Sequence, residues 1–172
     1  MRKFAALVLM LLIGVSPLIA QDTDFRSTSW GMTKSEVKSA EDNQLLQEKA
    51  NVLYYSDDLA GEQVYVVYQF EGQNNTLNQG QYILNAGFES GSQFVEYFES
   101  LESTMREDYG SPEVDTTLVQ AEQYQDKPAE GLENGEVQLQ TSWQTEETEI
   151  VIQLWNGDRG IQLAVQYIGK TA

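Results

Sequence analysis

The sequence predicts an α+β fold: an antiparallel sheet of about six strands packed against two helices, in the order helix, three strands, helix, three strands. Two apolar patterns lead to this prediction. A stripe with a period near 3.6 residues runs through residues 90–110 and is typical of an amphipathic helix. Apolar and polar residues alternate in three closely spaced segments at the end of the chain, which is typical of half-buried strands. The short connections between those segments require antiparallel neighbours.

The first predicted helix begins in the segment Met32-Thr33-Lys34-Ser35-Glu36-Val37 and ends near residue 41. Thr33 and Glu36 have the spacing of a capping box, and Met32 and Val37 that of a hydrophobic staple. Three strands are predicted next, at about residues 51–56, 64–70 and 81–88, with turns at residues 57–62 and 72–80. The middle strand is apolar on both faces, which favours a central place in the sheet.

The second predicted helix is the strongest element of the pattern. Its apolar stripe consists of five residues spaced three or four apart, Phe94, Phe98, Leu101, Met105 and Tyr109. Ser90 and Gln93 offer a capping box at its start, and Gly110 and Pro112 end it. The opposite face, which includes Glu99, is expected to be solvated.

Residues 120–136 are polar and contain Pro and Gly, so they are predicted to form a loop. The closing strands follow at about residues 137–144, 150–154 and 161–167. Trp143 shares the parity of Leu139 and is expected in the core, whereas Trp155 has the opposite parity to Leu154 and is expected to be exposed. The repeated order of elements leaves two interpretations, a duplication or a single two-layer domain. Because the halves lack residue-level similarity, the second is preferred.

Residues 1–20 have the layout of a secretory signal peptide. Arg2 and Lys3 precede an apolar run over residues 4–15, and a small-ended stretch leads to predicted cleavage after Ala20. That run is shorter than the roughly 20 residues that span a bilayer, so no stable membrane anchor is expected. No Cys follows it to carry a lipid. The remaining residues, 21–172, are predicted to form one secreted or periplasmic domain that is not a lipoprotein.

Composition excludes several kinds of chemistry and of partner. The chain has no Cys and no His, which removes disulfides, thiolate nucleophiles, Ser-His-Asp relays and typical zinc or copper sites. It has 10 basic and 27 acidic residues, and loss of the leader's two basic residues changes the net charge from −17 to 8 − 27 = −19. This charge repels phosphate backbones and anionic lipid, so nucleic acid and membrane are not expected as partners.

Three segments of the chain, residues 25–37, 94–112 and 148–167, resemble a family of uncharacterised secreted or periplasmic bacterial proteins. The shared pattern is Phe-x-x-x-x-Trp-Gly-Met-Thr at the start and a helix that ends in Tyr-Gly-x-Pro. The resemblance implies fold and location but no activity. The Gly31-Met32-Thr33 helix start is also similar to the BamE/SmpA-type assembly proteins and to β-lactamase-inhibitor-like domains, which implies a scaffold that binds other proteins. The missing lipid-bearing Cys departs from the BamE pattern.

Acidic residues suggest two alternative sites. Asp57, Asp58 and Glu62 flank one turn and Glu89 ends a strand, and two carboxylates about 5–10 Å apart can hydrolyse a glycosidic bond. Turn carboxylates more often serve backbone hydrogen bonding. Calcium could bind the acidic residues of the 120–136 segment, Glu122, Asp126, Glu130, Glu133 and Glu136. They lack the spacing of an EF-hand, so a solvated segment is preferred and no metal or cofactor is predicted.

The function expected from the sequence is non-enzymatic binding of a protein or peptide, the partner being another envelope or extracellular protein. Trp155, Tyr124 and Glu130 are the predicted partner-binding residues. The alternative is a carboxylate-dependent hydrolase that acts on cell-wall glycan. A deep cleft with two facing carboxylates would favour the enzyme, and a shallow apolar patch or an open sheet edge would favour the binder.

Overall fold

The computed structural model describes residues 23–170. The predicted signal peptide, residues 1–20 with its cleavage after Ala20, lies outside the described residues. None of the helices within residues 23–170 combines the length and apolarity needed to cross a membrane.

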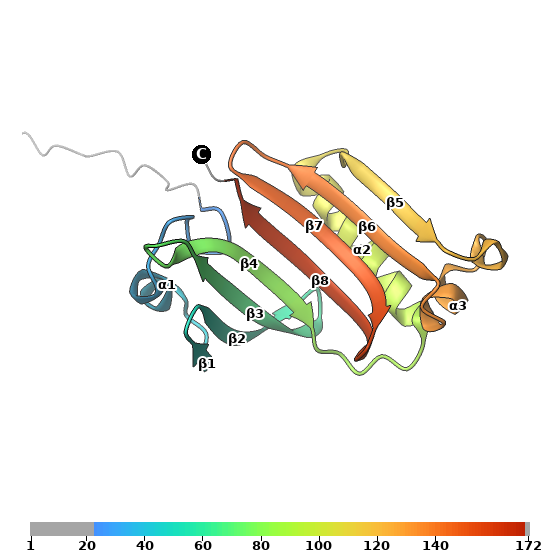
Figure 1. The fold of residues 1–172 in the computed structure, drawn as a ribbon, viewed down its shortest axis with the longest axis horizontal. Helices are drawn as coiled ribbons and strands as arrows, with labels where there is room; N and C mark the ends of the chain where they lie inside the picture. The colour runs from blue at the N-terminus through green and yellow to red at the C-terminus, as the bar shows by residue number, and fades with distance from the viewer. Residues whose placement is uncertain (1–22, 171–172) are drawn as a thin grey trace, which may run out of the picture.

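One eight-stranded antiparallel sheet dominates the fold, with the order β1-β2-β3-β4-β8-β7-β6-β5 (Figure 1). Its strands are β1 (Leu45–Lys49), β2 (Val52–Leu59), β3 (Glu62–Glu71), β4 (Thr76–Leu84), β5 (Val114–Val119), β6 (Val137–Gln144), β7 (Thr148–Gly157) and β8 (Gly160–Gly169). The helices are α1 (Lys34–Ala40), α2 (Gly91–Tyr109) and α3 (Pro128–Glu133), with a 3-10 turn at Glu122–Tyr124. The predicted fold of about six strands on two helices is therefore wrong in its number of strands and helices.

The two missed strands are the edges of the sheet. In the described part of the chain, β1 and β5 each pair with one strand. Many of their side chains stay exposed on both faces, so the sequence does not alternate. The third predicted strand was also placed too late, because β4 begins at Thr76, directly after a turn in which Asn75 has φ 50°. Pairing of Glu71 with Thr76 closes that turn.

The predicted loop at residues 120–136 instead contains a 3-10 turn and the helix α3, which packs against the core. Pro128 is at the start of α3, and Leu132 is completely buried. Gly131 allows close packing, since a Cβ there would lie 2.3 Å from Val137 Cγ2. The sequence pattern did not predict α3, because this helix has only six residues and is too short to show an apolar stripe.

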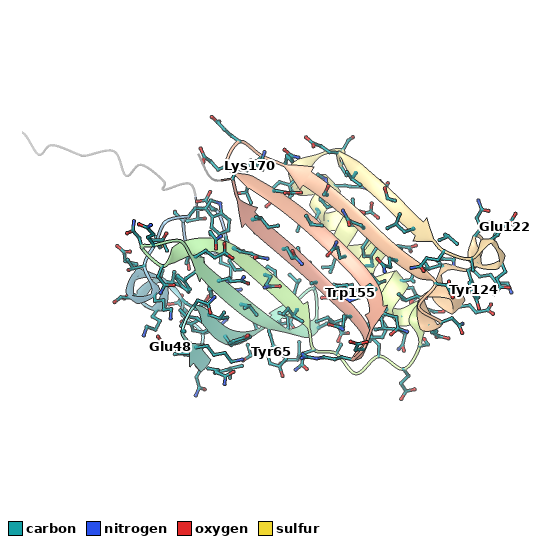
Figure 2. The ribbon with its side chains drawn as sticks, in the orientation of Figure 1. Glu48, Tyr65, Glu122, Tyr124, Trp155 and Lys170 are labelled. Atoms are coloured by element: carbon teal, nitrogen blue, oxygen red, sulfur yellow. The ribbon has the colours of Figure 1, made fainter. Side chains whose placement is uncertain are left out.

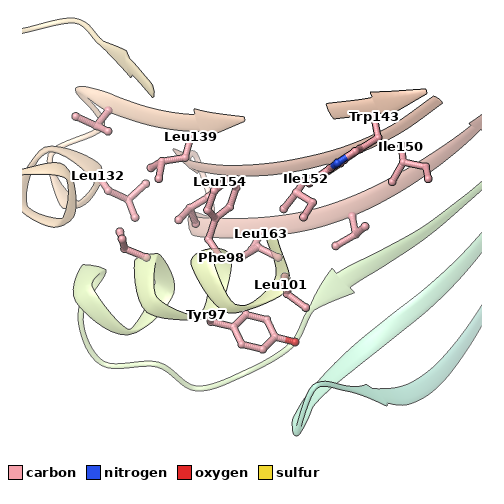
Figure 3. Close-up of a cluster of buried hydrophobic side chains, with 13 residues drawn as sticks. Tyr97, Phe98, Leu101, Leu132, Leu139, Trp143, Ile150, Ile152, Leu154 and Leu163 are labelled. Carbon is pink, nitrogen blue, oxygen red and sulfur yellow. The ribbon is translucent and has the colours of Figure 1, made fainter. Parts of the chain in front are cut away.

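The helices α2 and α3 cover one half of one sheet face, which we call the inner face (Figure 1). Phe98 and Leu101 of α2 are buried against β6, β7 and β8, as the apolar stripe predicted (Figure 3). Tyr109, the last residue of that stripe, is exposed instead. Trp143 is buried as expected, and its indole N–H donates to the Gly110 carbonyl at 2.9 Å. Tyr97 adds a contact to the other half of the sheet, because its hydroxyl donates to the Leu59 carbonyl at 2.5 Å.

The other half of the inner face is covered by the segment before α1 and by α1 itself. The predicted capping box of Thr33 and Glu36 is present. Val37 and Phe25 are buried against β2, β3 and β4. The Phe25 ring lies directly on Gly80, where a Cβ would come within 2.0 Å of the ring.

A buried ion pair fixes this N-terminal segment. Arg26 contacts Glu41 through Nε and Nη2 at 3.0 and 3.1 Å, and its Nη1 lies 2.6 Å from Asp57 Oδ2. Tyr68 donates its hydroxyl to Glu41 at 2.5 Å. Burial raises the pKa of Tyr68, and the bond to Glu41 raises it further. Burial alone would lower the pKa of Arg26, but the carboxylates of Glu41 and Asp57 hold this pKa above its usual range.

Candidate interaction surface

The opposite face of the sheet is not covered by any helix among residues 23–170, and we call it the open face. It is turned toward the viewer in Figure 1, with α2 behind the sheet. Residues that pair across strands share a face, so the register defines a row across the sheet. One such row is Thr116, Gln140, Gln153, Ala164, Ile83, Tyr65 and Ser56.

The open face is uncharged over most of its width, although the chain has 27 acidic residues. From β4 to β5 the paired register places one charged residue on it, Glu149. Glutamines dominate this area: Gln79, Gln81, Gln138, Gln140, Gln144, Gln153, Gln162 and Gln166. Apart from Glu149, the polar surface of these strands therefore carries amides and hydroxyls in place of carboxylates.

Trp155 lies on this face in a hollow of about 230 Å³ (Figure 2). It is half-buried, and its indole N–H donates no hydrogen bond to the described residues. Leu118 also lines the hollow, together with Gln140 and Gln153, whose side chains are joined by a 2.9 Å hydrogen bond. Because one amide group of each glutamine is used in that bond, each keeps a further polar group for a ligand.

A second hollow, of about 380 Å³, lies on the other half of the open face. It is lined by exposed Tyr65, half-buried Tyr54, and the cations Lys49 and Arg159. The Lys49 ammonium lies 5.0 Å from the centre of the Tyr54 ring, within the range of a cation–π contact. Aromatic and cationic groups thus meet here on a molecule that is otherwise acidic.

The three predicted partner-binding residues do not form one site. Trp155 lies on the open face, as its parity indicated. Tyr124 is half-buried and packs against the core, with its Cβ 2.8 Å from a Cβ placed on Gly131. Glu130 is exposed on α3 and pairs with Lys127 at 3.1 Å. Figure 2 places Tyr124 near the Glu122 turn, away from Trp155.

The carboxylates suggested for catalysis have structural contacts. Asp57 and Asp58 are consecutive in β2 and so point to opposite faces. Burial alone would raise the pKa of Asp57, but hydrogen bonds from the Asp58 N–H and from Arg26 hold this pKa below its usual range. Asp58 accepts the Gly61 N–H at 2.9 Å, which is a turn contact. Glu89 is exposed at the start of α2, and Glu62 is half-buried at the start of β3.

One hollow, of about 360 Å³, does contain three carboxylates, Asp24, Glu146 and Glu147. Asp24 accepts the Trp30 N–H at 2.8 Å. Glu146 and Glu147 are exposed in the turn between β6 and β7, so solvent surrounds them. Among residues 23–170, no three His, Cys, Asp or Glu side chains are grouped so that they could hold a metal ion.

The sequence reasoning missed Tyr54, Tyr65 and Arg159 as surface residues. Tyr65 alternates with Val64 and Val66, so its place on the open face was readable from parity. The position of Arg159 was not readable, because it depends on how the β7–β8 hairpin lies against β2 and β3.

Comparisons with protein-family models, with curated proteins and with solved structures found no match to this chain.

Proposed function

We propose that this chain is a non-enzymatic binding domain whose open face docks against another protein. The observation that supports this proposal is the composition of that face. Protein interfaces are depleted in Lys, Glu and Asp at their centre and enriched in Tyr, Trp and Arg. Trp155 lines one hollow of the open face, and Tyr65, Tyr54 and Arg159 line the other. From β4 to β5 this face is rich in amides and carries one charged residue, Glu149.

Burial of this face costs less than burial of a charged one. An amide that loses water without finding a partner costs roughly 1–3 kcal/mol, and an isolated charge costs much more. Tyr and Trp are also the residues that most often act as hot spots. Tyr65 is 39% exposed, so its ring has area left to bury against a partner.

The test begins with capture of a partner from the native envelope or culture medium by the mature chain, with identification by mass spectrometry. The affinity of the purified pair is then measured for Trp155→Ala and Tyr65→Ala. Each substitution is expected to weaken binding about tenfold or more, a loss of about 1.4 kcal/mol. Circular dichroism should show an unchanged fold.

Tyr109→Ala is the matched control, because Tyr109 is exposed to the same 39% but lies at the end of α2, off the open face. It should leave the affinity unchanged. An equal loss from Tyr65→Ala and Tyr109→Ala would contradict the assignment of the open face. If the protein hydrolyses envelope glycan and one Asp or Glu substitution abolishes that activity, the protein is a hydrolase and the binding proposal is wrong.

A further inference from the structure

Within residues 23–170, no strand pairs with the outer side of β5, which lies at the edge of the sheet. This strand has six residues, and two of them, Val114 and Leu118, are apolar and 39% and 52% exposed. Both lie on the open face, since they pair with Ser142 and Gln138 of β6. Exposed apolar edge strands are templates for pairing with another strand.

The other edge strand, β1, is protected in ways that β5 is not. A register shift interrupts β1 between Leu45 and Gln47. Lys34 donates to the Lys49 carbonyl at 2.8 Å and also to the Ala50 carbonyl. Bulges and lysines are the usual means of preventing edge pairing. In contrast, the register of β5 is regular from Val114 to Val119, and the strand contains no Lys, Arg or Pro. The irregularity on this edge lies just before the strand, where Glu113 also donates its N–H to the Ser142 carbonyl at 2.8 Å.

The hydrogen bonds identify which backbone groups of β5 are free. Gln120 donates its N–H to the Glu136 carbonyl at 2.8 Å, in the same register as the β5–β6 pairs. Hydrogen-bonded positions alternate along an antiparallel strand, so the even-numbered residues of β5 bond to β6. Asp115, Thr117 and Val119 therefore direct their N–H and C=O groups away from the sheet.

We propose that a second copy of this chain pairs antiparallel with β5, about a two-fold axis at Thr116. In this register Asp115 lies opposite Thr117 of the second copy, so the free groups exchange both N–H···O bonds. Val114 then lies opposite Leu118 of the second copy. These are non-hydrogen-bonded pairs, in which the Cα atoms are only about 4.5 Å apart, so the exposed apolar side chains cover each other.

Self-complementarity favours a second copy over an unrelated strand. In a two-fold interface, if residue i of one copy contacts residue j of the other, then residue j of the first copy also contacts residue i of the second. The Val114 and Leu118 pair meets this condition, and Asp115 does not face its own copy. Asp115 is instead paired with Arg106 of its own chain at 2.6 Å. The dimer covers Val114 and Leu118 at the β5 edge of the open face and does not involve Tyr65 or Arg159, so this inference does not rest on the proposed function.

Charge predicts an unusual salt dependence for this dimer. Each copy carries a formal net charge of −17, or −19 without the predicted leader, and the pairing itself uses apolar and neutral groups. Added salt screens the repulsion between the copies. The dimer should therefore strengthen as salt rises, whereas an interface held by ion pairs would weaken.

Cross-linking tests the register directly, because the chain has no Cys. Thr116→Cys places two thiols opposite each other at the two-fold axis, within the about 4.4–6.8 Å Cα separation of a disulfide. Oxidation of the purified mature protein should give a disulfide dimer. In Thr117→Cys the thiols are offset by two residues, beyond the limit of about 7 Å, and cross-linking should be at least several-fold slower. Equal rates for the two variants, or no cross-linking of Thr116→Cys, would overturn the proposal.

Sedimentation analysis from low micromolar to millimolar concentration tests the edge without a covalent bond. The unmodified protein should dimerise as concentration rises. Leu118→Lys and Thr117→Pro should stay monomeric, and Thr117→Pro removes only an N–H that faces away from β6. Leu46→Lys is the matched control on β1, because Leu46 is 51% exposed, and it should dimerise normally. If the unmodified protein stays monomeric at every concentration, self-pairing is wrong. If Thr117→Pro instead abolishes binding of a different protein, the β5 edge pairs with that protein and not with a second copy.

Discussion

The contact between Phe25 and Gly80 gives the sharpest prediction about stability. A Cβ on residue 80 would lie 2.0 Å from Phe25 Cδ1, so Gly80→Ala must displace the ring or β4. The ring is packed among Tyr68, Tyr82 and Tyr167, with centroid separations of 5.3, 5.2 and 5.1 Å. Loss of such a buried ring costs about 3–5 kcal/mol. Gly80→Ala should therefore lower the free energy of unfolding by about 3 kcal/mol or more.

A double-mutant cycle in urea separates this clash from any backbone effect. In the Phe25→Ala background the space is empty, so Gly80→Ala should cost less than about 1 kcal/mol, a coupling of about 2 kcal/mol or more. Gly87→Ala is the control, because a Cβ there meets nothing within 4 Å. It should change stability by no more than about 0.5 kcal/mol. Additive losses from Phe25→Ala and Gly80→Ala would show that the ring does not depend on the glycine.

Three further predictions concern the core, the ion pair and the leader. Phe98→Ala should cost about 3–5 kcal/mol in urea melts, and exposed Glu99→Ala should stay within about 0.5 kcal/mol; equal losses would place the wrong face of α2 in the core. Because the folded pKa of Asp57 is lowered, its contribution is complete above the ordinary carboxyl range and is lost as pH falls through the folded pKa, so Asp57→Asn should flatten the acid end of the stability profile. Mass spectrometry of the exported protein should find a start near Gln21, and retention of residues 4–15 would contradict the signal-peptide prediction.

Strong local patterns predicted the elements that bury one continuous face. The spacing of Phe98 and Leu101 located α2, and the alternation around Trp143 located β6. β5 escaped prediction because Asp115, Thr117 and Leu118 are all exposed, so burial imposed no period on them. α3 escaped because Leu132 is the only large apolar side chain that this short helix buries completely.

The sheet order also bears on the origin of the fold. The first half is α1 followed by an antiparallel meander of β1 to β4. The second half is α2 followed by β5 to β8, with the 3-10 turn and α3 inserted between β5 and β6, and the halves join through β4 and β8. This is the arrangement that a duplication would give. The sequence did not reveal it, because β1 and β5 were missed and α1 has 7 residues where α2 has 19.

Parity predicted one member of the candidate surface but could not assemble it. The alternation with Leu154 placed Trp155 outside the core. That rule cannot show which residues of distant strands become neighbours. Tyr54 and Arg159 are separated by more than a hundred residues in sequence and line one hollow only because β8 pairs with β4. The packing of Tyr124 against Gly131 could not be predicted from the sequence, because it depends on α3.

The amide-rich open face argues for contact with a partner and not only for solubility. A chain with 27 acidic residues has ample charge to solvate an uncovered sheet. Carboxylates on β6 and β7 would do so, yet Glu149 is the one carboxylate at their outward positions, which also hold Gln138, Gln140 and Gln153. A glutamine keeps the face hydrated when it is free, and its donor and acceptor can bond to a partner when it is covered. A carboxylate could only accept, and its burial would require a cation opposite it. Amide side chains therefore fit a surface that is exposed to water in the free protein and covered when a partner binds.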